Sequence, residues 1–188
     1  MLLKRKSKNC IIYIRYRTLC SMKTEKCEIP AESLVYKFFP ADYSDSFNVK
    51  VEQSIKATPD DLLVGFWTDM PAFVNVLFKI RNFLVRFVGL KGPEGRDTKD
   101  LENSIRNGVE SGFMSVPVKD EHETVMLLKD THLNAYLSVR ISDDKRIVYA
   151  NTLVKYNKCL GKIYFAIIRP FHSIVVKQTL KRAIKRAI

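Results

Sequence analysis

The feature that most constrains the fold of this chain is the strict alternation of apolar and polar side chains along Leu133–Ile141. A period of two residues places each set of side chains on its own face, which is typical of a strand in a half-buried antiparallel sheet. Turn residues precede and follow this strand, at Asp130-Thr131 and Asp143-Asp144. Further strands are predicted at Phe113–Val118, Glu123–Lys129 and Arg146–Tyr156. Together these segments predict an antiparallel meander of about four strands.

The first half of the chain predicts one more strand and two helices. Ser46–Glu52 alternates as Leu133–Ile141 does. Thr58-Pro59-Asp60-Asp61 then predicts a helix start, because threonine caps helices, proline suits the first turn and acids suit the positive end. A second helix is predicted at about Ala72–Val88, which is large and apolar outside one narrow polar stripe. The loop that follows is predicted to hold a short helix near Asp97–Arg106.

The segment from Cys159 to the end predicts a long helix whose apolar face rotates by roughly half a turn along its length. In the last turns that face is formed by Val176, Leu180 and Ile184. Pro170 lacks an amide hydrogen, so we expect the helix to kink there. Lys177–Ile188 is therefore predicted to be a separately oriented, basic amphipathic piece.

This order of elements predicts an α+β fold. An antiparallel sheet with one buried face needs a cover, and the long C-terminal helix is the available cover. We expect the sheet to wrap on that helix, with the two short helices closing one end, in a single domain spanning 22–188. Such a layout encloses a space between sheet and helix, and small ligands usually bind in spaces of this kind.

The distribution of charge narrows the possible partners more than the net charge of +12 does. Residues 1–21 contain six basic and no acidic side chains, and residues 177–188 contain five and none. The body of the chain between them is nearly neutral, which argues against a nucleic-acid partner. The basic helical end at Lys177–Ile188 leaves an anionic membrane surface open as a partner.

Targeting patterns are weak in this sequence. Met1–Ser21 has too short an apolar stretch for a secretory signal. We expect it to be an N-terminal extension that is either disordered or the product of a misplaced start, upstream of Met22. Leu62–Phe78 and Leu160–Val176 are interrupted by charged residues or proline and fail as membrane spans. The four cysteines lack CxxC or metal-ligand spacing, which favours reduced thiols, a cytoplasmic location and no metal site.

Five short stretches carry a resemblance to a known family. They are Ala41-Asp42-Tyr43-Ser44-Asp45-Ser46-Phe47, Leu77-Phe78-Lys79-Ile80-Arg81-Asn82-Phe83, Val88-Gly89-Leu90-Lys91, Leu160-Gly161-Lys162-Ile163-Tyr164-Phe165 and Arg169-Pro170-Phe171-His172. Together they resemble domain of unknown function 2867, a bacterial family that we associate with the START-like, helix-grip (SRPBCC) superfamily. The resemblance covers roughly Met22 to the C-terminus. It implies a helix-grip fold with a pocket, and it supplies no established reaction.

Six residues are candidates for a ligand site in that pocket: Asp45, Trp67, Arg81, Tyr136, Tyr164 and His172. Arg81 falls inside the apolar arc of its helix. There its guanidinium could clamp a ligand carboxylate or phosphate. Alternatively, it could form an internal ion pair with Asp42 or Asp45, or its aliphatic stem could carry the charge to the rim. Asp45 could serve acid–base chemistry or satisfy turn amides, and His172 could transfer protons or fix a backbone carbonyl. The three aromatics suit an amphipathic ligand, but aromatics of this kind are more often core and rim residues.

These features predict binding of a small hydrophobic or amphipathic molecule in an internal cavity. The alternative is a hydrolase or cyclase that uses a carboxylate or histidine, with Arg81 orienting an anion. A further alternative is a membrane-surface module that uses Lys177–Ile188. The sequence contains no nucleophile elbow, P-loop or dinucleotide fingerprint, so no cofactor is expected.

Overall fold

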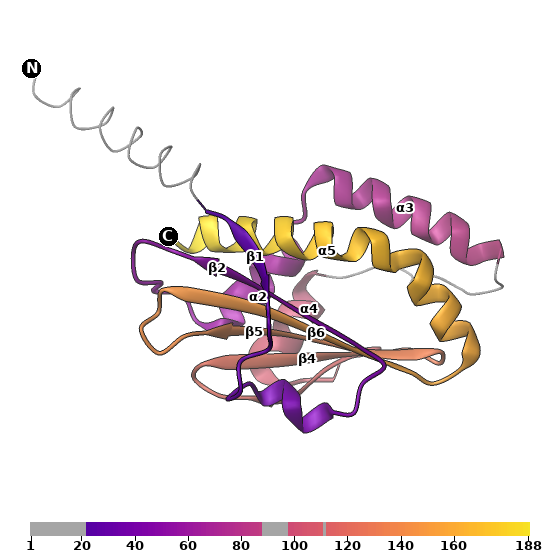
Figure 1. The fold of residues 1–188 in the computed structure, drawn as a ribbon, viewed down its shortest axis with the longest axis horizontal. Coiled ribbons are helices and arrows are strands. Elements are labelled where there is room, and N and C mark those ends of the chain that lie inside the picture. The colour runs from indigo at the N-terminus through magenta and orange to yellow at the C-terminus, as the bar shows by residue number, and fades with distance from the viewer. Residues whose placement is uncertain (1–21, 88–97, 111) are drawn as a thin grey trace, which may run out of the picture.

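The computed structural model describes residues 22–87, 98–110 and 112–188 (Figure 1). The expected N-terminal extension, residues 1–21, lies outside the described residues. Within the described ranges, one six-stranded antiparallel sheet is packed against helices, so the predicted α+β fold is confirmed.

The strands form the sheet in the order β1-β2-β6-β5-β4-β3. Their bounds are β1 Thr24–Cys27, β2 Tyr43–Lys50, β3 Met114–Lys119, β4 Glu123–Lys129, β5 Leu133–Ile141 and β6 Ile147–Tyr156. The predicted meander is confirmed, and β4 and β5 have the predicted bounds. β2 pairs with β6, with Asp45 opposite Thr152. This pairing brings the start of the domain beside the last strand.

In the described part of the chain, the helices are the 3-10 helix η1 and four α-helices. Their bounds are η1 Leu34–Phe38, α2 Pro59–Thr68, α3 Ala72–Phe87, α4 Thr98–Asn107 and α5 Cys159–Ala187. The predicted start of α2 is a capping box, in which the Thr58 hydroxyl accepts the Asp61 N–H while the Asp61 carboxylate accepts the Thr58 N–H. This reciprocal pair satisfies two amides that the first helical turn leaves without partners.

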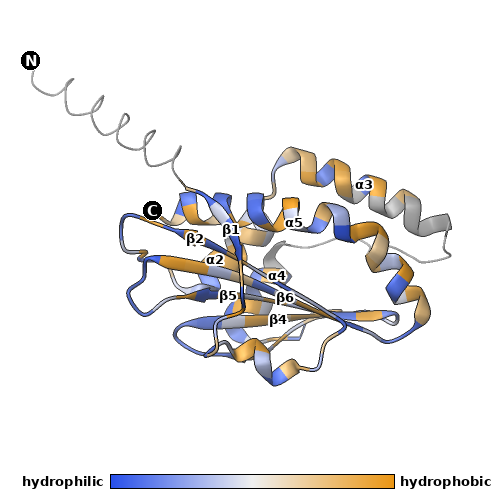
Figure 2. Cartoon of the chain, viewed as in Figure 1, coloured by the Kyte–Doolittle hydropathy of each residue, from blue (hydrophilic) through white to orange (hydrophobic). Residues whose placement is uncertain are grey.

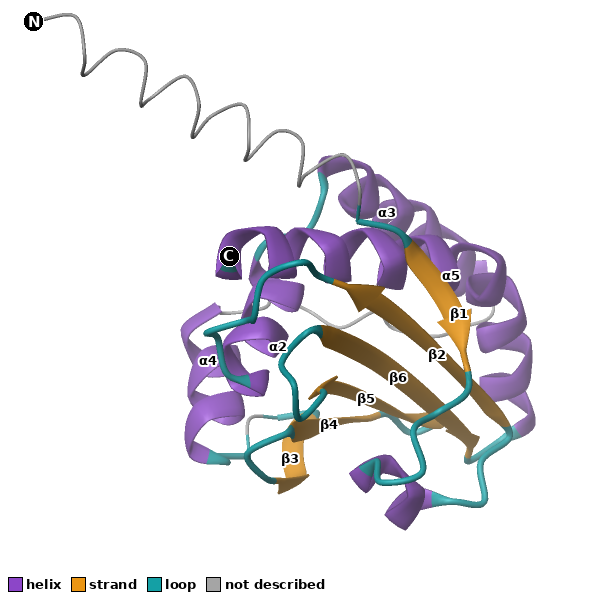
Figure 3. Cartoon of the chain, turned by 60° about the vertical axis from the view of Figure 1, so that its left-hand side comes forward, coloured by secondary structure: helices purple, strands orange, loops and turns teal. Residues whose placement is uncertain are grey.

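Both faces of the sheet are covered in part. α5 and α2 pack on one face, and the main core there includes Phe47, Leu63, Met126, Leu180 and Ile184. η1 packs on the opposite face of β4, where Val35 contacts Val125 and Leu127. This second layer explains why β4 is buried over five consecutive residues. The sheet, the long helix across it and the short helices at its end (Figure 3) are consistent with a helix-grip fold.

α5 is one helix that runs through Pro170 and bends along its length (Figure 1). Its last turns bury Val176, Leu180 and Ile184 in the main core, against the sheet and α2. The apolar face rotates as expected, and the bend gives the two halves of α5 different directions. Lys177–Ile188 does not stand apart from the domain, because its apolar face packs in the core.

Two basic residues of this last part are anchored to α2. The Nε atoms of Arg182 and Arg186 lie 3.0 Å and 2.6 Å from the two carboxylate oxygens of Asp69, which is 6% exposed. The ion pairs hold the end of α5 against the C-terminal end of α2. Two of the positive charges that suggested a membrane-binding tail are thus paired with a carboxylate of the same domain.

Within the described part of the chain, one helix is long and apolar enough to cross a membrane by length and composition, and it is α5. The charged residues within Leu160–Val176 are thus too few to exclude it, contrary to the sequence-based expectation. Only 22% of the apolar window in α5 is buried. The first half of α5 therefore has apolar side chains that the core does not bury.

Candidate functional site

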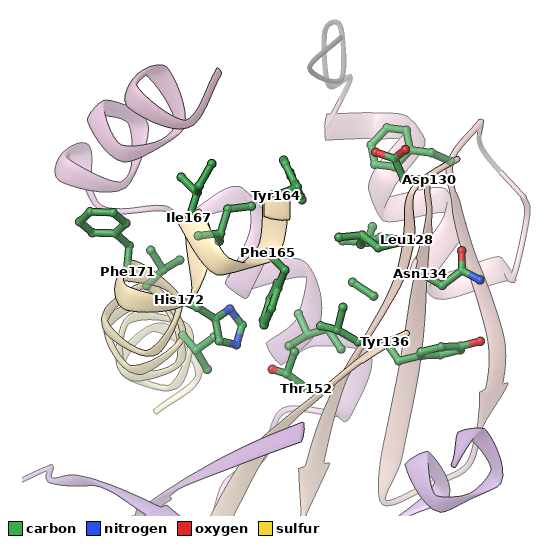
Figure 4. Close-up of a pocket in the computed structure, with 18 of the residues that line it drawn as sticks. Leu128, Asp130, Asn134, Tyr136, Thr152, Tyr164, Phe165, Ile167, Phe171 and His172 are labelled. Carbon is green, nitrogen blue, oxygen red and sulfur yellow. The ribbon is translucent and has the colours of Figure 1, made fainter. Parts of the chain in front are cut away.

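A cavity of about 810 Å³ lies beneath the first half of α5 (Figure 4). α2 and α3 border it on one side, and β4, β5 and β6 border it on the other. Most of its wall is aliphatic or aromatic: Met70, Val74, Leu77, Leu128, Ala135, Leu137, Phe165, Ile168, Phe171 and Val175. The void has the size and the apolar lining of a small-molecule site.

Three polar side chains from three elements meet at one side of this cavity. Asp45 of β2 and Thr152 of β6 are cross-strand partners that face α5. The His172 imidazole, from α5, places Nε2 3.4 Å from Oδ1 of Asp45. The Tyr43 hydroxyl donates a hydrogen bond to Oδ2 of Asp45 at 2.7 Å. Figure 4 shows the His172 ring and the Thr152 side chain near each other on the cavity wall. We call Asp45, Thr152 and His172 the polar anchor.

The electrostatics of the polar anchor favour an ionised Asp45. Burial disfavours its charge, but the hydrogen bonds and charge supplied by His172 and Tyr43 outweigh burial and lower the pKa of Asp45. Thr152 also lowers this pKa, although its hydroxyl lacks the geometry of a hydrogen bond. Burial, together with the hydrogen bond to Asp45, raises the pKa of Tyr43 well above its ordinary value. Tyr43 therefore keeps its proton and remains a donor.

The Thr152 hydroxyl is the most informative atom of the site. Its oxygen is buried and has no hydrogen-bond partner within the described ranges. Buried hydroxyls normally have partners, because a lost hydrogen bond costs about 1–3 kcal/mol. Since Thr152 borders the cavity, this hydroxyl is placed to bond a polar group that enters the cavity.

The structure brings together only some of the predicted site residues. Asp45 and His172 are paired, and Trp67, Tyr164 and His172 border the cavity. Asp45 lies behind His172, with its side chain 1% exposed. These positions follow from the strand register and from the turn of α5 that carries His172 above β2.

Two predicted site residues contribute differently. Tyr136 borders the cavity from β5, but its ring stacks on Phe38 of η1 with a centroid separation of 4.5 Å and points away from the cavity (Figure 4). The Tyr136 ring therefore supplies no cavity wall. The Arg81 side chain, with both of its predicted roles, lies outside the described residues.

Sequence reasoning missed Thr152 as a site residue. Along β6, Val148, Ala150 and Val154 share its face, so a threonine at 152 interrupts an apolar alternation. This interruption was a usable signal, although the mixed polarity of Arg146–Tyr156 obscured it. Among the described residues, no three His, Cys, Asp or Glu side chains converge in a way that could hold a metal ion.

Comparisons with known proteins add one finding. A family model described as a protein of unknown function, DUF2867, matches residues 39–179. The matched range contains β2, the helices that border the cavity, the meander and the polar anchor. No curated protein and no solved structure matches the chain.

Proposed function

The chain belongs to the DUF2867 family, whose function is unknown, and we propose that it binds a small hydrophobic or amphipathic ligand in the cavity beneath α5. The observation that carries the proposal is the contrast between a mostly apolar wall and the polar anchor at one side of it. The other polar lining residues gather around the β4–β5 turn: Lys129, Asp130, Thr131, Asn134 and Asn157. Sites of roughly 300–1,000 Å³ with apolar walls and a few placed polar groups are typical of small-molecule binding. The 810 Å³ cavity has both properties.

The polar anchor indicates how the ligand lies. Its polar end would contact the hydroxyl of Thr152 and the imidazole of His172. Its apolar part would extend along the aliphatic and aromatic lining, which includes Leu77, Leu128 and Phe171. A ligand with one oxygen-bearing end and a hydrocarbon body fits this arrangement, because most of the wall between the polar anchor and the β4–β5 turn is apolar and offers no partner for further polar groups.

The proposal includes a link to the START-like superfamily and a bacterial, cytoplasmic setting. The strand order, with β2 beside β6, and the long helix across the sheet support the link. The family resemblance supports the bacterial origin. Cys27 and Cys159 are free thiols, which fits a reducing compartment.

The test is a cavity-filling substitution with a matched surface control. Ala135→Trp would place an indole in the cavity, whereas Ala166→Trp adds one to the exposed side of α5. We expect the unmodified protein and Ala166→Trp to bind the fluorophore 8-anilinonaphthalene-1-sulfonate in vesicle-free buffer, with Ala135→Trp binding at least about tenfold more weakly. Equal binding by both variants, or no binding by the folded parent, would refute the cavity as a ligand site.

A second candidate function rests on the Asp45–His172 pair. A carboxylate that accepts Nε2–H leaves Nδ1 of His172 to take a proton from water or from a ligand hydroxyl, as a general base does. This arrangement would suit a hydrolase or cyclase. If it is catalytic, His172→Gln removes turnover of an ester panel, Asp45→Asn reduces it, and both retain fluorophore binding. Turnover that survives His172→Gln would exclude this role.

A further inference from the structure

Two neighbouring helices expose apolar side chains beside the cavity. On α3 these are Phe73, Val76, Ile80 and Phe83, and on α5 they are Ile163, Phe171 and Ile174. Spacings of three and four residues on α3, and of eight and three residues on α5, put each set on one side of its helix. α3 packs against α5, and Figure 2 shows apolar residues along both. We call this surface the α3–α5 face. A folded monomer rarely exposes this many large apolar side chains together.

The α3–α5 face continues into the cavity. Ile80 and Phe171 border the cavity and are also 44% and 40% exposed, so they stand where the cavity meets the surface. Val76 and Ile163, which do not border the cavity, are 54% and 50% exposed. The apolar wall thus extends outward as an apolar surface around the opening.

The charged residues of α3 and α5 indicate what kind of partner binds the α3–α5 face. α3 contains three basic residues and α5 contains seven, and neither contains an acidic residue. Arg182 and Arg186 are paired with Asp69 at the far end of α5, but Lys79 and Lys162 are exposed on the helical segments beside the cavity. Lys79 follows Val76 by one turn, so its ammonium flanks the exposed apolar side chains. Exposed apolar side chains flanked by basic ones match an anionic lipid surface.

We propose that the α3–α5 face docks on an anionic lipid bilayer, so that the cavity opens toward the acyl chains. α5 lies in the interface rather than across the bilayer, because its last turns are packed in the core through Val176, Leu180 and Ile184. The docking surface is therefore the first half of α5 with α3, and it differs from the Lys177–Ile188 tail. The part of this inference that concerns ligand entry rests on the proposed function; docking itself does not.

The experiment measures co-sedimentation of the full chain with sucrose-loaded vesicles. Vesicles of phosphatidylcholine with 30% phosphatidylglycerol are compared with vesicles of phosphatidylcholine alone. We expect binding to the anionic vesicles, with affinity reduced at least about tenfold by the double variant Val76→Glu/Ile174→Glu, since two apolar side chains leave the interface and two anions enter it. Val109→Glu is the matched control, because Val109 is 47% exposed outside this face.

A second double variant tests the contribution of the basic residues to vesicle binding. Lys79→Gln/Lys162→Gln should weaken anionic binding several-fold and leave binding to neutral vesicles unchanged. Lys26→Gln/Lys56→Gln, in exposed positions away from both helices, should have little effect. Vesicle binding that persists unchanged in Val76→Glu/Ile174→Glu would overturn the proposal, since residues 1–21 would then account for it.

Two further outcomes also overturn docking. One is absence of vesicle binding by the folded parent. The other is a concentration-dependent dimer, measured by light scattering, that Val76→Glu/Ile174→Glu dissociates, since a second copy would then cover the face. The fluorophore assay in vesicle-free buffer separates this proposal from the proposed function. Loss of vesicle binding with intact fluorophore binding rejects docking alone, and the reverse result rejects the cavity alone.

Discussion

The imidazole of His172 and the carboxylate of Asp45 are separated by 127 residues of sequence, yet Nε2 of His172 lies 3.4 Å from Oδ1 of Asp45. The pair joins the first half of α5 to β2 at the cavity wall. Phe165 and Tyr43 pack around it, with ring centroids 6.0 Å and 6.1 Å from the imidazole. One interaction therefore positions the polar anchor and fastens the helix that covers the cavity.

Asp45→Asn should destabilise the protein at neutral pH and reduce the loss of its folding stability at acidic pH. The pKa of Asp45 is lower in the folded protein than its ordinary value of 3.8. Its contribution to stability is therefore complete above that ordinary value and is lost as the pH falls through the lower, folded value. We expect a loss of about 1–3 kcal/mol at pH 7, because His172 and Tyr43 lose a charged acceptor. Urea denaturation from pH 7 to pH 3 measures both effects.

Asp143→Asn is the control, since the Asp143 side chain is 84% exposed. It should change the free energy of unfolding by less than about 0.5 kcal/mol. If the free energy of unfolding of Asp45→Asn falls with pH as steeply as that of the parent, the ionised Asp45–His172 pair is not part of the folded state.

Gly161→Ala should destabilise the junction between the meander and α5. A Cβ at residue 161 would overlap the carbonyl oxygen of His132. That oxygen accepts the N–H groups of Asn157 and Lys158 and cannot move away without loss of these bonds. We expect a cost of about 1–3 kcal/mol, measured by thermal and urea unfolding.

Gly65→Ala provides the opposite case within a helix. Its Cβ would lie 3.4 Å from Cβ of Ala183, an ordinary contact. Alanine favours helix over glycine by up to about 1 kcal/mol, so stability should be unchanged or increased. A larger loss for Gly65→Ala than for Gly161→Ala would contradict the close packing of α5 on the β4–β5 turn.

The elements that sequence could predict are those with long, regular patterns. β5 alternates over nine residues, and Thr58 with Asp61 identifies the start of α2. β1 has four residues and η1 has five, which is too short for a period to be recognised. η1 also depends on a distant partner, because its first amide is bonded by Glu123. The rotation of apolar faces along α5 was visible, but the sequence could not show which face the core would take.

The site was predicted less completely than the fold. Asp45 and His172 were both recognisable as unusual, but their pairing depends on the path of α5 over β2. The Tyr136 ring follows the alternation of β5 onto the opposite face, where Phe38 of η1 covers it. Since η1 was not predicted, nothing in the sequence explained where a buried aromatic on that face would pack.

Glu123→Gln should destabilise the fold strongly from the face opposite the cavity. The Glu123 side chain is fully buried and accepts the Ser33 hydroxyl and the Leu34 N–H, each at 2.7 Å. Nη1 of Arg140, which is 8% exposed, lies 3.9 Å from its carboxylate. Removing the negative charge takes away the buried counter-charge of this guanidinium and leaves only the exposed carboxylate of Asp143, whose Oδ1 lies 3.9 Å from Nη2, at a cost of up to about 3–5 kcal/mol. Urea denaturation and hydrogen exchange of the Leu34 amide measure the loss.

Glu121→Gln serves as the control for this substitution, because the Glu121 side chain is 84% exposed. It should leave both measurements unchanged. A loss below about 1 kcal/mol for Glu123→Gln, with the Leu34 amide still protected, would mean that a neutral amide satisfies Ser33 and Leu34 equally well.

Thr152→Val should change the stability of the ligand-free protein little and weaken binding of amphipathic ligands. Valine has nearly the shape of threonine and removes a buried hydroxyl that has no hydrogen-bond partner in the described structure, which favours the variant. It also removes a group that lowers the pKa of Asp45, which opposes that gain, so we expect a change of less than about 1 kcal/mol at pH 7. Thr179→Val is the matched control, because the Thr179 hydroxyl donates to the Val175 carbonyl at 2.7 Å and its loss should cost about 1 kcal/mol. Urea unfolding gives both values. In the ligand assay, Thr152→Val should bind decanol more weakly than the parent and decane equally well, because only the alcohol can use the hydroxyl. Equal loss for the two compounds would place the polar end of the ligand elsewhere in the cavity.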